Sequence, residues 1–156
     1  MRFSIIAVGK LKERFWTQAC GEYLKRLQPY AKTNVVELAD VDPARVGGEA
    51  ASVEREGAAI LKAIPERAYV VLLAIEGTQR SSEGLSAHVE DLALSGRSEI
   101  VFVIGGSCGV SDAVRGRANE TLSFGPITLP HNLARVVLLE QLYRACKISR
   151  GEPYHK

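Results

Sequence analysis

Tyr69–Ile75 has the sequence YVVLLAI and Glu99–Ile104 has the sequence EIVFVI. These two stretches decide the fold, because a strand with one solvated face alternates apolar and polar residues, whereas a nearly continuous apolar run is typical of a strand covered on both faces. Between them, Ser81 or Ser82 can cap a helix that extends to about Leu94, with Gly96 ending it. A helix between two such strands predicts a parallel sheet with helices packed on both faces.

The same alternation of strand and helix continues outward in both directions. Toward the N-terminus the pattern predicts strands at Arg2–Val8 and Asn34–Leu38, helices over about 15–27 and 53–64, and a loop at Asp40–Gly48. Toward the C-terminus it predicts a short helix from Ser111, an extended piece at Thr121–Leu129 broken by Gly125-Pro126, and a last helix at about Leu133–Ile148. The fold class is therefore α/β, with a mostly parallel sheet flanked by helices in a single domain over residues 1–156.

Length and composition exclude several classes of protein. The chain has 156 residues and a formal net charge of +2, which is ordinary for one compact domain. No apolar run approaches the length of a membrane helix, and the three cysteines, at positions 20, 108 and 146, form no CxxC pair. These features indicate a cytoplasmic protein with no disulfide framework. The three histidines and three cysteines show no metal-ligand spacing, so we expect no metal.

The small net charge conceals a separation of charge along the chain. Residues 1–32 carry seven Lys or Arg and two Glu, a net +5, and residues 131–156 carry five Lys or Arg and two Glu, a net +3. Residues 33–130 carry eight basic and fourteen acidic side chains, a net −6. The two basic ends converge into one surface for an anionic ligand, or they simply solvate two separate helices; the charges alone leave both interpretations open.

The last predicted helix is apolar on more than one face. Apolar residues recur at nearly every position from Leu133 to Leu139 and again at Leu142, Tyr143, Ala145, Cys146 and Ile148. A helix that flanks a sheet buries one face, so a second apolar face requires a partner. We expect this face to form a homodimer interface, the alternative being a fully internal helix.

Two glycine- or proline-containing segments are candidates for binding a small molecule. Gly105-Gly106-Ser107-Cys108-Gly109 follows a buried strand, and the carboxyl ends of parallel strands are where open α/β sheets bind ligands. Phe124–His131 contains two prolines around a short apolar run, which predicts a bent segment with free backbone groups. Neither segment matches a dinucleotide or P-loop motif, and each is also explained as a rigid structural loop.

The C-terminal residues combine aromatic, polar and basic groups. Tyr154 and His155 follow Arg144, Lys147 and Arg150, and aromatic rings among cations suit an unpaired RNA base and its phosphates. The alternative is an ordinary frayed terminus. Elsewhere in the chain, Cys108 is the one nucleophile worth naming, and we expect His88 to be a surface residue of its helix.

Six motifs resemble those of the bacterial ribosomal RNA large subunit methyltransferase H family, a minimal group of the SPOUT methyltransferases. They are Ile5–Lys10, Glu22–Leu27, Phe102–Gly106, Thr128–His131, Glu140–Ala145 and Pro153–Lys156, and they cover the whole chain in order. The resemblance implies a trefoil knot in the C-terminal half, an obligate homodimer and S-adenosylmethionine as methyl donor. It also implies the reaction, methylation of N3 of pseudouridine 1915 in helix 69 of 23S rRNA.

The resemblance also assigns site residues. Carried over by position, contacts to the donor fall on Leu73, Gly105, Phe124, Gly125, Pro126, Ile127, Thr128 and Leu129. Ser107, Val110 and the rigid Phe124-Gly125-Pro126 depart from the family pattern and affect details of this cradle. We predict Tyr154, His155 and Arg144 as the catalytic, substrate-positioning residues, with the tail of one chain acting in the site of the other. The proton acceptor stays open, and His131 is a further candidate.

The partner follows from the same assignment. We expect 23S rRNA within the 50S or 70S particle, because the nearly neutral chain favours a shaped target over free RNA held by many phosphate contacts. A non-catalytic, ribosome-associated RNA-binding protein is the alternative function.

Overall fold

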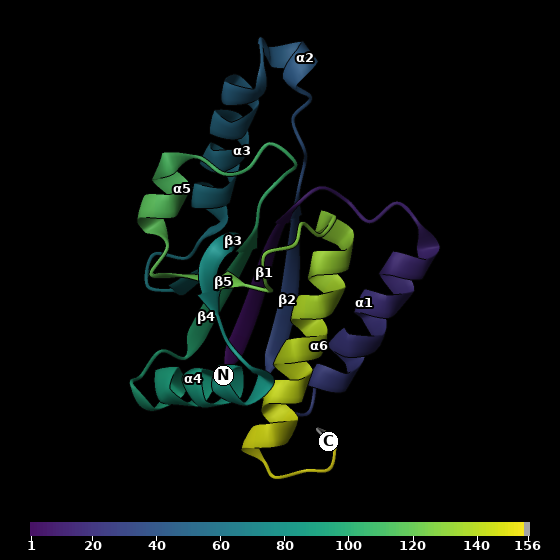
Figure 1. Cartoon of the computed structure of the whole chain (residues 1–156), viewed down its shortest axis with the longest axis vertical. Coiled ribbons are helices and arrows are strands. Elements are labelled where there is room, and N and C mark those ends of the chain that lie inside the picture. Colours follow the sequence, from purple (N-terminus) through teal and green to yellow (C-terminus); the bar gives the residue numbers. More distant parts are fainter. Residues whose placement is uncertain (155–156) are drawn as a thin grey trace.

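A computed structural model of the chain describes residues 1–154. Its strands are β1 (Arg2–Val8), β2 (Lys32–Leu38), β3 (Tyr69–Gln79), β4 (Glu99–Ile104) and β5 (Glu120–Ser123). Its helices are α1 (Arg14–Leu27), α2 (Pro43–Val46), α3 (Glu49–Ala63), α4 (Ser82–Leu94), α5 (Asp112–Arg117) and α6 (His131–Ser149). Figure 1 shows α6 running from the upper end of the sheet to the end of the molecule where the chain terminates.

The five strands form one sheet in the order β2-β1-β4-β3-β5, with parallel pairing throughout. In the register, Ile5 of β1 lies between Val35 of β2 and Phe102 of β4. Helices α1, α4 and α6 cover one face, and α3 and α5 cover the other (Figure 1). This confirms the α/β class and the parallel sheet flanked by helices.

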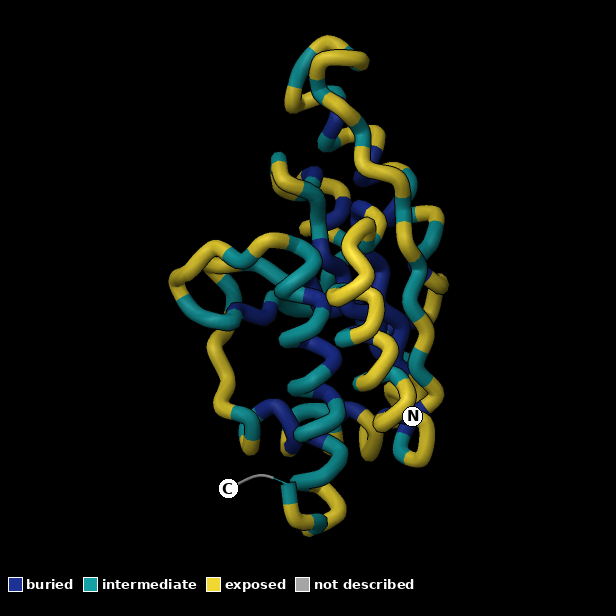
Figure 2. Tube along the Cα trace, turned by 90° about the vertical axis from the view of Figure 1, so that its right-hand side faces the viewer, coloured by how far each residue is buried: buried dark blue, intermediate teal, exposed yellow. Residues whose placement is uncertain are grey.

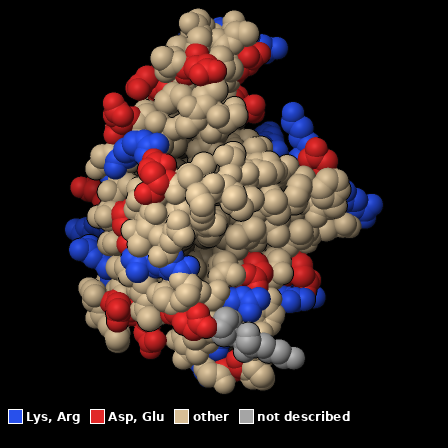
Figure 3. Space-filling model, viewed as in Figure 1, with Lys and Arg blue, Asp and Glu red and all other residues tan. Residues whose placement is uncertain are grey.

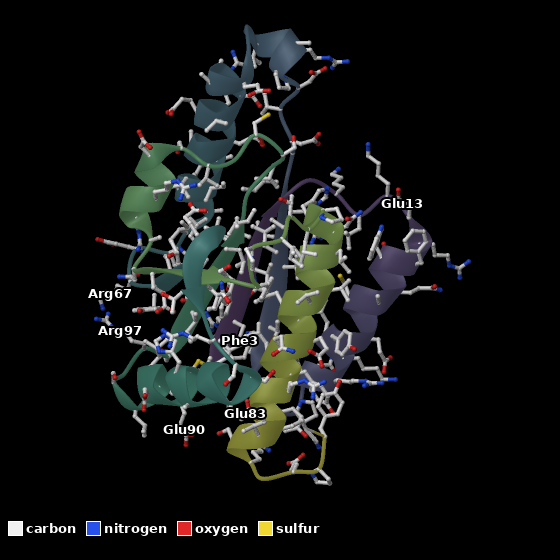
Figure 4. The ribbon with its side chains drawn as sticks, viewed as in Figure 1. Phe3, Glu13, Arg67, Glu83, Glu90 and Arg97 are labelled. Carbon is white, nitrogen blue, oxygen red and sulfur yellow. The ribbon has the colours of Figure 1, made fainter. Side chains whose placement is uncertain are left out.

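Alternate residues of each strand enter two separate cores. Phe3 and Ile5 of β1 belong to the cluster beneath α1, α4 and α6, whereas Ile6 and Val8 belong to the cluster beneath α3 and α5. Figure 4 shows Phe3 at the lower end of the sheet, where its ring meets that of Phe102 edge-on at 6.1 Å. Val70–Leu72 of β3 and Ile100–Ile104 of β4 are buried, so both faces of these segments are covered, whereas Ile75, at the end of the apolar run of β3, is 49% exposed. The buried backbone, dark blue in Figure 2, gathers in the middle of the molecule.

Two expectations from the sequence need correction. The predicted loop at Asp40–Gly48 contains the short helix α2, because Asp42 accepts a hydrogen bond from Ala44 N at 3.0 Å and Pro43 occupies the first helical position. The extended piece predicted to reach Leu129 ends at Ser123. Beyond it Gly125 has a φ of +109°, and Pro126 has no N–H to donate to a neighbouring strand.

Strand β3 bends around β5. Its first part pairs with β5 up to Leu73, and its second part pairs again from Thr78 after a shift in register. At the bend, a Cβ added to Gly77 would lie 2.9 Å from backbone atoms of Leu122 and Thr121. The two backbones are therefore in direct contact at the bend. The trefoil knot itself stays a prediction.

A buried guanidinium fixes α6 to the sheet. Arg135 is 1% exposed, and it donates to Glu37 Oε2 at 2.6 Å and to the carbonyl oxygen of Gly9 at 3.0 Å. The same Glu37 oxygen accepts the backbone N–H of Leu11 at 3.2 Å. Partial burial acts to raise the pKa of Glu37, but the hydrogen bonds from Arg135 and Leu11 outweigh it and lower the pKa below its ordinary value. This network joins the first turns of α6 to the carboxyl ends of β1 and β2.

We predict that Arg135→Ala lowers the free energy of unfolding by about 3 kcal/mol, measured by urea titration at neutral pH. The substitution leaves the Gly9 carbonyl without its donor, Glu37 without its cation and a void beneath α6. Arg14→Ala, at an exposed position of α1, is the control and should change stability by less than about 0.5 kcal/mol. In the wild type the contribution of Glu37 is present above its ordinary pKa and is lost as the pH falls through the lowered one. A loss no greater than that of the control would contradict this role for Arg135.

Gly77→Ala tests the close backbone contact between β3 and β5. Since the added methyl group would meet backbone and not a movable side chain, we expect a loss of about 2 kcal/mol or more in unfolding free energy. Gly21→Ala is a matched control in α1, where the new Cβ meets nothing within 4 Å and should stabilise the helix by up to about 1 kcal/mol. Equal changes in unfolding free energy for the two substitutions would refute this close contact.

Candidate functional site

A cleft of about 530 Å³ opens at the carboxyl ends of β3 and β4, the edge where open parallel sheets bind ligands. Its volume is within the range of small-molecule sites. The walls come from the end of β3, from the turn after β4, and from the segment that joins β5 to α6. Of the residues predicted to bind the donor, Leu73, Gly105, Phe124, Gly125, Ile127, Thr128 and Leu129 line the cleft, and Pro126 does not.

Two glycines of the turn after β4 lie close to neighbouring side chains. A Cβ on Gly105 would lie 2.5 Å from Val110 Cγ1, and one on Gly106 would lie 2.6 Å from Glu56 Oε2. Gly109 closes the turn, since its N–H donates to the Gly106 carbonyl oxygen at 3.1 Å and its φ is +90°. The backbone of this turn therefore forms the wall of the cleft directly, with no side chain at Gly105 or Gly106 between it and a ligand.

The segment from Phe124 to Pro130 forms the opposite wall without regular secondary structure. Ser123 Oγ accepts the N–H of Gly125 at 3.1 Å and donates to the Ile75 carbonyl oxygen at 2.7 Å, which anchors the segment where it leaves β5. Ile127 is 59% exposed. A segment outside the sheet leaves backbone N–H and C=O groups free to bind a ligand.

Three charged or titratable residues of the cleft were not among the predicted donor contacts. Glu76 and Arg115 line the cleft and form an ion pair, with 2.6 Å between Arg115 Nη1 and Glu76 Oε1. A hydrogen bond from the backbone N–H of Glu76 to its own carboxylate lowers the pKa of Glu76, and the hydrogen bond from Arg115 lowers it further. His131 lines the cleft from the first turn of α6 and packs against Gly9, whose added Cβ would lie 2.8 Å from His131 Cε1. Of these three residues, only His131 was predicted from the sequence as a site candidate, and nothing in the pattern indicated Arg115.

The tail folds back on α6. The ring of Tyr154 lies 4.8 Å from that of Tyr143 and 4.6 Å from the guanidinium carbon of Arg144, and its hydroxyl donates to Glu140 Oε1 at 3.2 Å. The same oxygen accepts Arg144 Nε at 3.0 Å. Burial, and then the charge of Glu140, raise the pKa of Tyr154 to about 12. His155, predicted beside it, lies outside the described residues.

The two basic ends of the chain meet at this tail. The guanidinium carbon of Arg26 on α1 lies 5.9 Å from the ring centre of Tyr143 on α6, and that of Arg150 lies 4.7 Å from the ring centre of Tyr30. Figure 4 shows Arg67 and Arg97 on the side of the molecule away from α1, pointing outward. Cations from both basic ends of the chain therefore lie around the same tail, among them Arg26 of α1, which was not predicted as a site residue. That they form a surface for an anionic ligand stays a prediction.

The structure does not bring the tail to the cleft of its own chain. The cleft contains His131, at the start of α6, and Arg144 follows thirteen residues later, about 20 Å along the axis at 1.5 Å per residue. Figure 1 shows the C-terminal end of the described chain at the far end of α6 from the cleft edge of the sheet. The two halves of the predicted site are thus separate in one protomer.

The remaining candidates from the sequence have ordinary surroundings. His88 is not a free surface residue, because its Nε2 lies 2.7 Å from Glu120 Oε1 and its side chain is only 21% exposed. The polar contact recorded for the Cys108 thiol is with Ser107 Oγ at 3.9 Å. Within residues 1–154, no three His, Cys, Asp or Glu side chains are grouped to hold a metal ion. No helix in that range is long and apolar enough to cross a membrane.

Comparison with known proteins agrees with this architecture. A family model described as "Predicted SPOUT methyltransferase" matches residues 1–155. The chain is 52% identical over 159 aligned residues to the ribosomal RNA large subunit methyltransferase H of Listeria monocytogenes, with both chains covered completely. It is 52% identical to the protein of the same name from Bacillus cereus, again over the full length of both.

A solved structure supports the fold at much lower identity. A probable methylase family protein from Haemophilus influenzae superposes with a TM-score of 0.54 at 12% identity, covering 99% of this chain and 70% of that one. At this identity the similarity concerns the fold alone. The full-length match to the family model and the full-length relatives at 52% identity decide the classification: the chain belongs to the SPOUT methyltransferases and, within them, to the ribosomal RNA large subunit methyltransferase H family.

Proposed function

We propose that this chain is a cytoplasmic homodimer that transfers a methyl group from S-adenosylmethionine to large-subunit rRNA. The proposed target is N3 of pseudouridine 1915 in helix 69 of 23S rRNA, within the 50S or 70S particle. One observation carries the proposal: residues predicted as donor contacts, from three segments far apart in the sequence, line a single cleft. The names of the full-length relatives support the choice of rRNA as substrate.

The cleft suits the donor chemically. The glycine turn after β4 and the segment 124–130 offer backbone groups for the polar edges of a nucleoside, and Leu73, Phe124 and Leu129 offer apolar surface for its base. When bound, S-adenosylmethionine supplies a methyl group activated by the positive sulfonium. The chain's task is then to hold the acceptor nitrogen in line with that group, which by itself provides much of the rate acceleration.

The tail residues suit the handling of the RNA base. Removing the N3 proton leaves an anionic ring, and the guanidinium of Arg144 favours that charge. With a pKa of about 12, Tyr154 remains protonated at neutral pH, so its hydroxyl positions the base as a hydrogen-bond donor and does not accept the proton. His131, which lines the cleft, and His155 remain the candidates for the proton acceptor.

A second protomer would unite the two separated halves. The tail lies about 20 Å along α6 from the cleft of its own chain, a distance that an antiparallel neighbour would close. Much of α6 is only half-buried, including the apolar residues Leu133, Val137 and Ile148 (Figure 2). Figure 3 shows a surface free of charged residues across the first half of α6. An uncharged, half-buried helix face of this kind supports the expected two-fold interface.

Gly105→Arg tests the donor cleft. We expect no measurable S-adenosylmethionine binding by calorimetry, because a side chain at this position would meet Val110 and fill the space beside it. Gly116→Arg, at an exposed position of α5 where an added Cβ meets nothing within 4 Å, should bind the donor as the wild type does.

The same variants can be assayed for transfer of labelled methyl groups to undermodified naked rRNA, 50S particles and 70S particles. Wild type and Gly116→Arg should label an assembled particle, and Gly105→Arg should not. If the wild type labels none of the three substrates, the alternative function of a non-catalytic RNA-binding protein replaces the proposal.

Complementation tests whether the tail acts across a dimer. Gly105→Arg lacks a donor cleft but keeps its tail, and a chain lacking residues 154–156 lacks the tail but keeps its cleft. Mixed after dissociation and reassociation, the two inactive chains should regain about a quarter of wild-type methyl transfer. Random pairing makes half of the dimers mixed, and each mixed dimer has one complete site of two.

The control is sedimentation at micromolar concentration, which should show no 17.0 kDa species. A tail that acts within its own chain would give no recovery in the mixture, although each homodimer still sediments normally.

A further inference from the structure

Glu56 of α3 is a buried acid that the proposed reaction does not use. It is 5% exposed, and its Oε2 has no hydrogen-bond partner among the described residues. Its Oε1 is only 3.4 Å from Ser52 Oγ, a hydroxyl that already donates to the Val41 carbonyl oxygen at 2.6 Å. Burying a polar group without a good partner costs stability, so this position is not explained by folding alone.

The carboxyl group of Glu56 faces the back of the glycine turn. An added Cβ on Gly106 would lie 2.6 Å from Oε2 and 2.9 Å from Oε1 of Glu56. The next residue of α3, Gly57, lies against Ser111, which follows the turn and caps α5: an added Cβ on Gly57 would lie 2.4 Å from Ser111 Oγ. Helix α3 therefore packs against both the turn and the start of α5.

The other side of the same turn lines the cleft. Gly105, Gly106, Ser107, Gly109 and Val110 all belong to the cleft wall. Glu56 is therefore separated from a bound ligand by one layer of backbone. A group at this position controls where the backbone amides and carbonyls of the wall point, in the way that an outer layer of residues orients a binding site.

The chemical character of the Glu56 carboxyl group also matters. Burial, and the nearby negative charge of Asp40, raise the pKa of Glu56, while Ser52 acts in the opposite direction. Glu56 therefore binds a proton more readily than an exposed glutamate does, and a protonated carboxyl can donate as well as accept a hydrogen bond. An apolar side chain of similar size would fill the space but offer neither.

We infer that Glu56 is a positioning residue of the cleft: its carboxyl group holds the turn Gly105–Gly109 in the shape that binds the methyl donor. The inference rests on the proposed function, since it takes the cleft to be the donor site. It assigns to α3, which contributes no residue to the cleft wall, a role in donor affinity but none in RNA binding.

Glu56→Leu and Glu56→Gln separate this role from simple packing. Leu fills the space without polar atoms and should raise the Kd and the KM for S-adenosylmethionine at least tenfold, with little change in kcat or in the KM for the ribosomal substrate. Gln keeps the shape of the side chain and can both donate and accept hydrogen bonds. The Kd and KM of Glu56→Gln for S-adenosylmethionine should therefore stay within about threefold of the wild-type values. Glu54→Leu, at an exposed position of the same helix, is the matched control and should leave donor binding unchanged.

Thermal unfolding of each variant shows that it is folded, and we expect Glu56→Leu to be at least as stable as the wild type because it removes an unpartnered buried acid. If folded Glu56→Leu bound the donor with wild-type affinity, the inference about Glu56 would be overturned while the proposed function would stand. The same holds if Glu56→Gln bound the donor as weakly as Glu56→Leu. Absence of S-adenosylmethionine binding by the wild type would overturn the proposed function, and this inference with it.

Discussion

Burial of the Arg135 guanidinium is the constraint on which the rest of this structure depends. A buried cation needs a counter-charge and acceptors for its N–H groups: here Glu37 and the Gly9 carbonyl oxygen accept from its two terminal nitrogens, while the buried Nε has no partner among the described residues. These two contacts fix the start of α6 at the carboxyl ends of β1 and β2. His131 then packs against Gly9, and the segment 124–130 has to pass over the ends of β3 and β4 to reach that point. The wall of the cleft is thus a consequence of where one arginine is held.

The same placement explains how the chain divides its tasks. The first turn of α6 contributes to the cleft, its middle buries Leu138, Leu139 and Leu142 in the core, and its last turns carry the residues that hold the tail. Arg26 belongs to α1 and Tyr30 to the turn that follows it, yet both lie near the last turns of α6 or the tail because α1 lies beside α6. One helix therefore defines both ends of the proposed site, which the proposed homodimer would join.

The fold was predictable from the sequence because its signals are strong and local. The apolar runs of β3 and β4, the cap at Ser81 and the glycine at 96 all lie where the pattern placed them. The end of β5 was missed because Thr121–Leu129 has strand-like composition, and only its pairing with β3 shows that the ladder stops before Gly125. The lining of the cleft was predictable at Gly105 and in the segment Phe124–Leu129, Pro126 excepted, because glycine and proline mark where the chain leaves the sheet; that these residues bind the donor stays a prediction. Arg115 and Glu56 were not, because each looks like an ordinary polar residue of an amphipathic helix until the helix is seen against the turn after β4.

The contact of β5 with the bend of β3 has a consequence for synthesis of the chain. The cleft combines Leu73 from the middle of the sequence with residues 122–134 near its end, and the two come together only when β5 has passed the bend at Gly77. During translation, β1 to β4 can pair before that last segment is available, since domains gain structure from the N-terminal side first. A nascent or prematurely terminated chain that ends before β5 can therefore form part of the sheet but lacks the wall of the cleft that residues 122–134 supply.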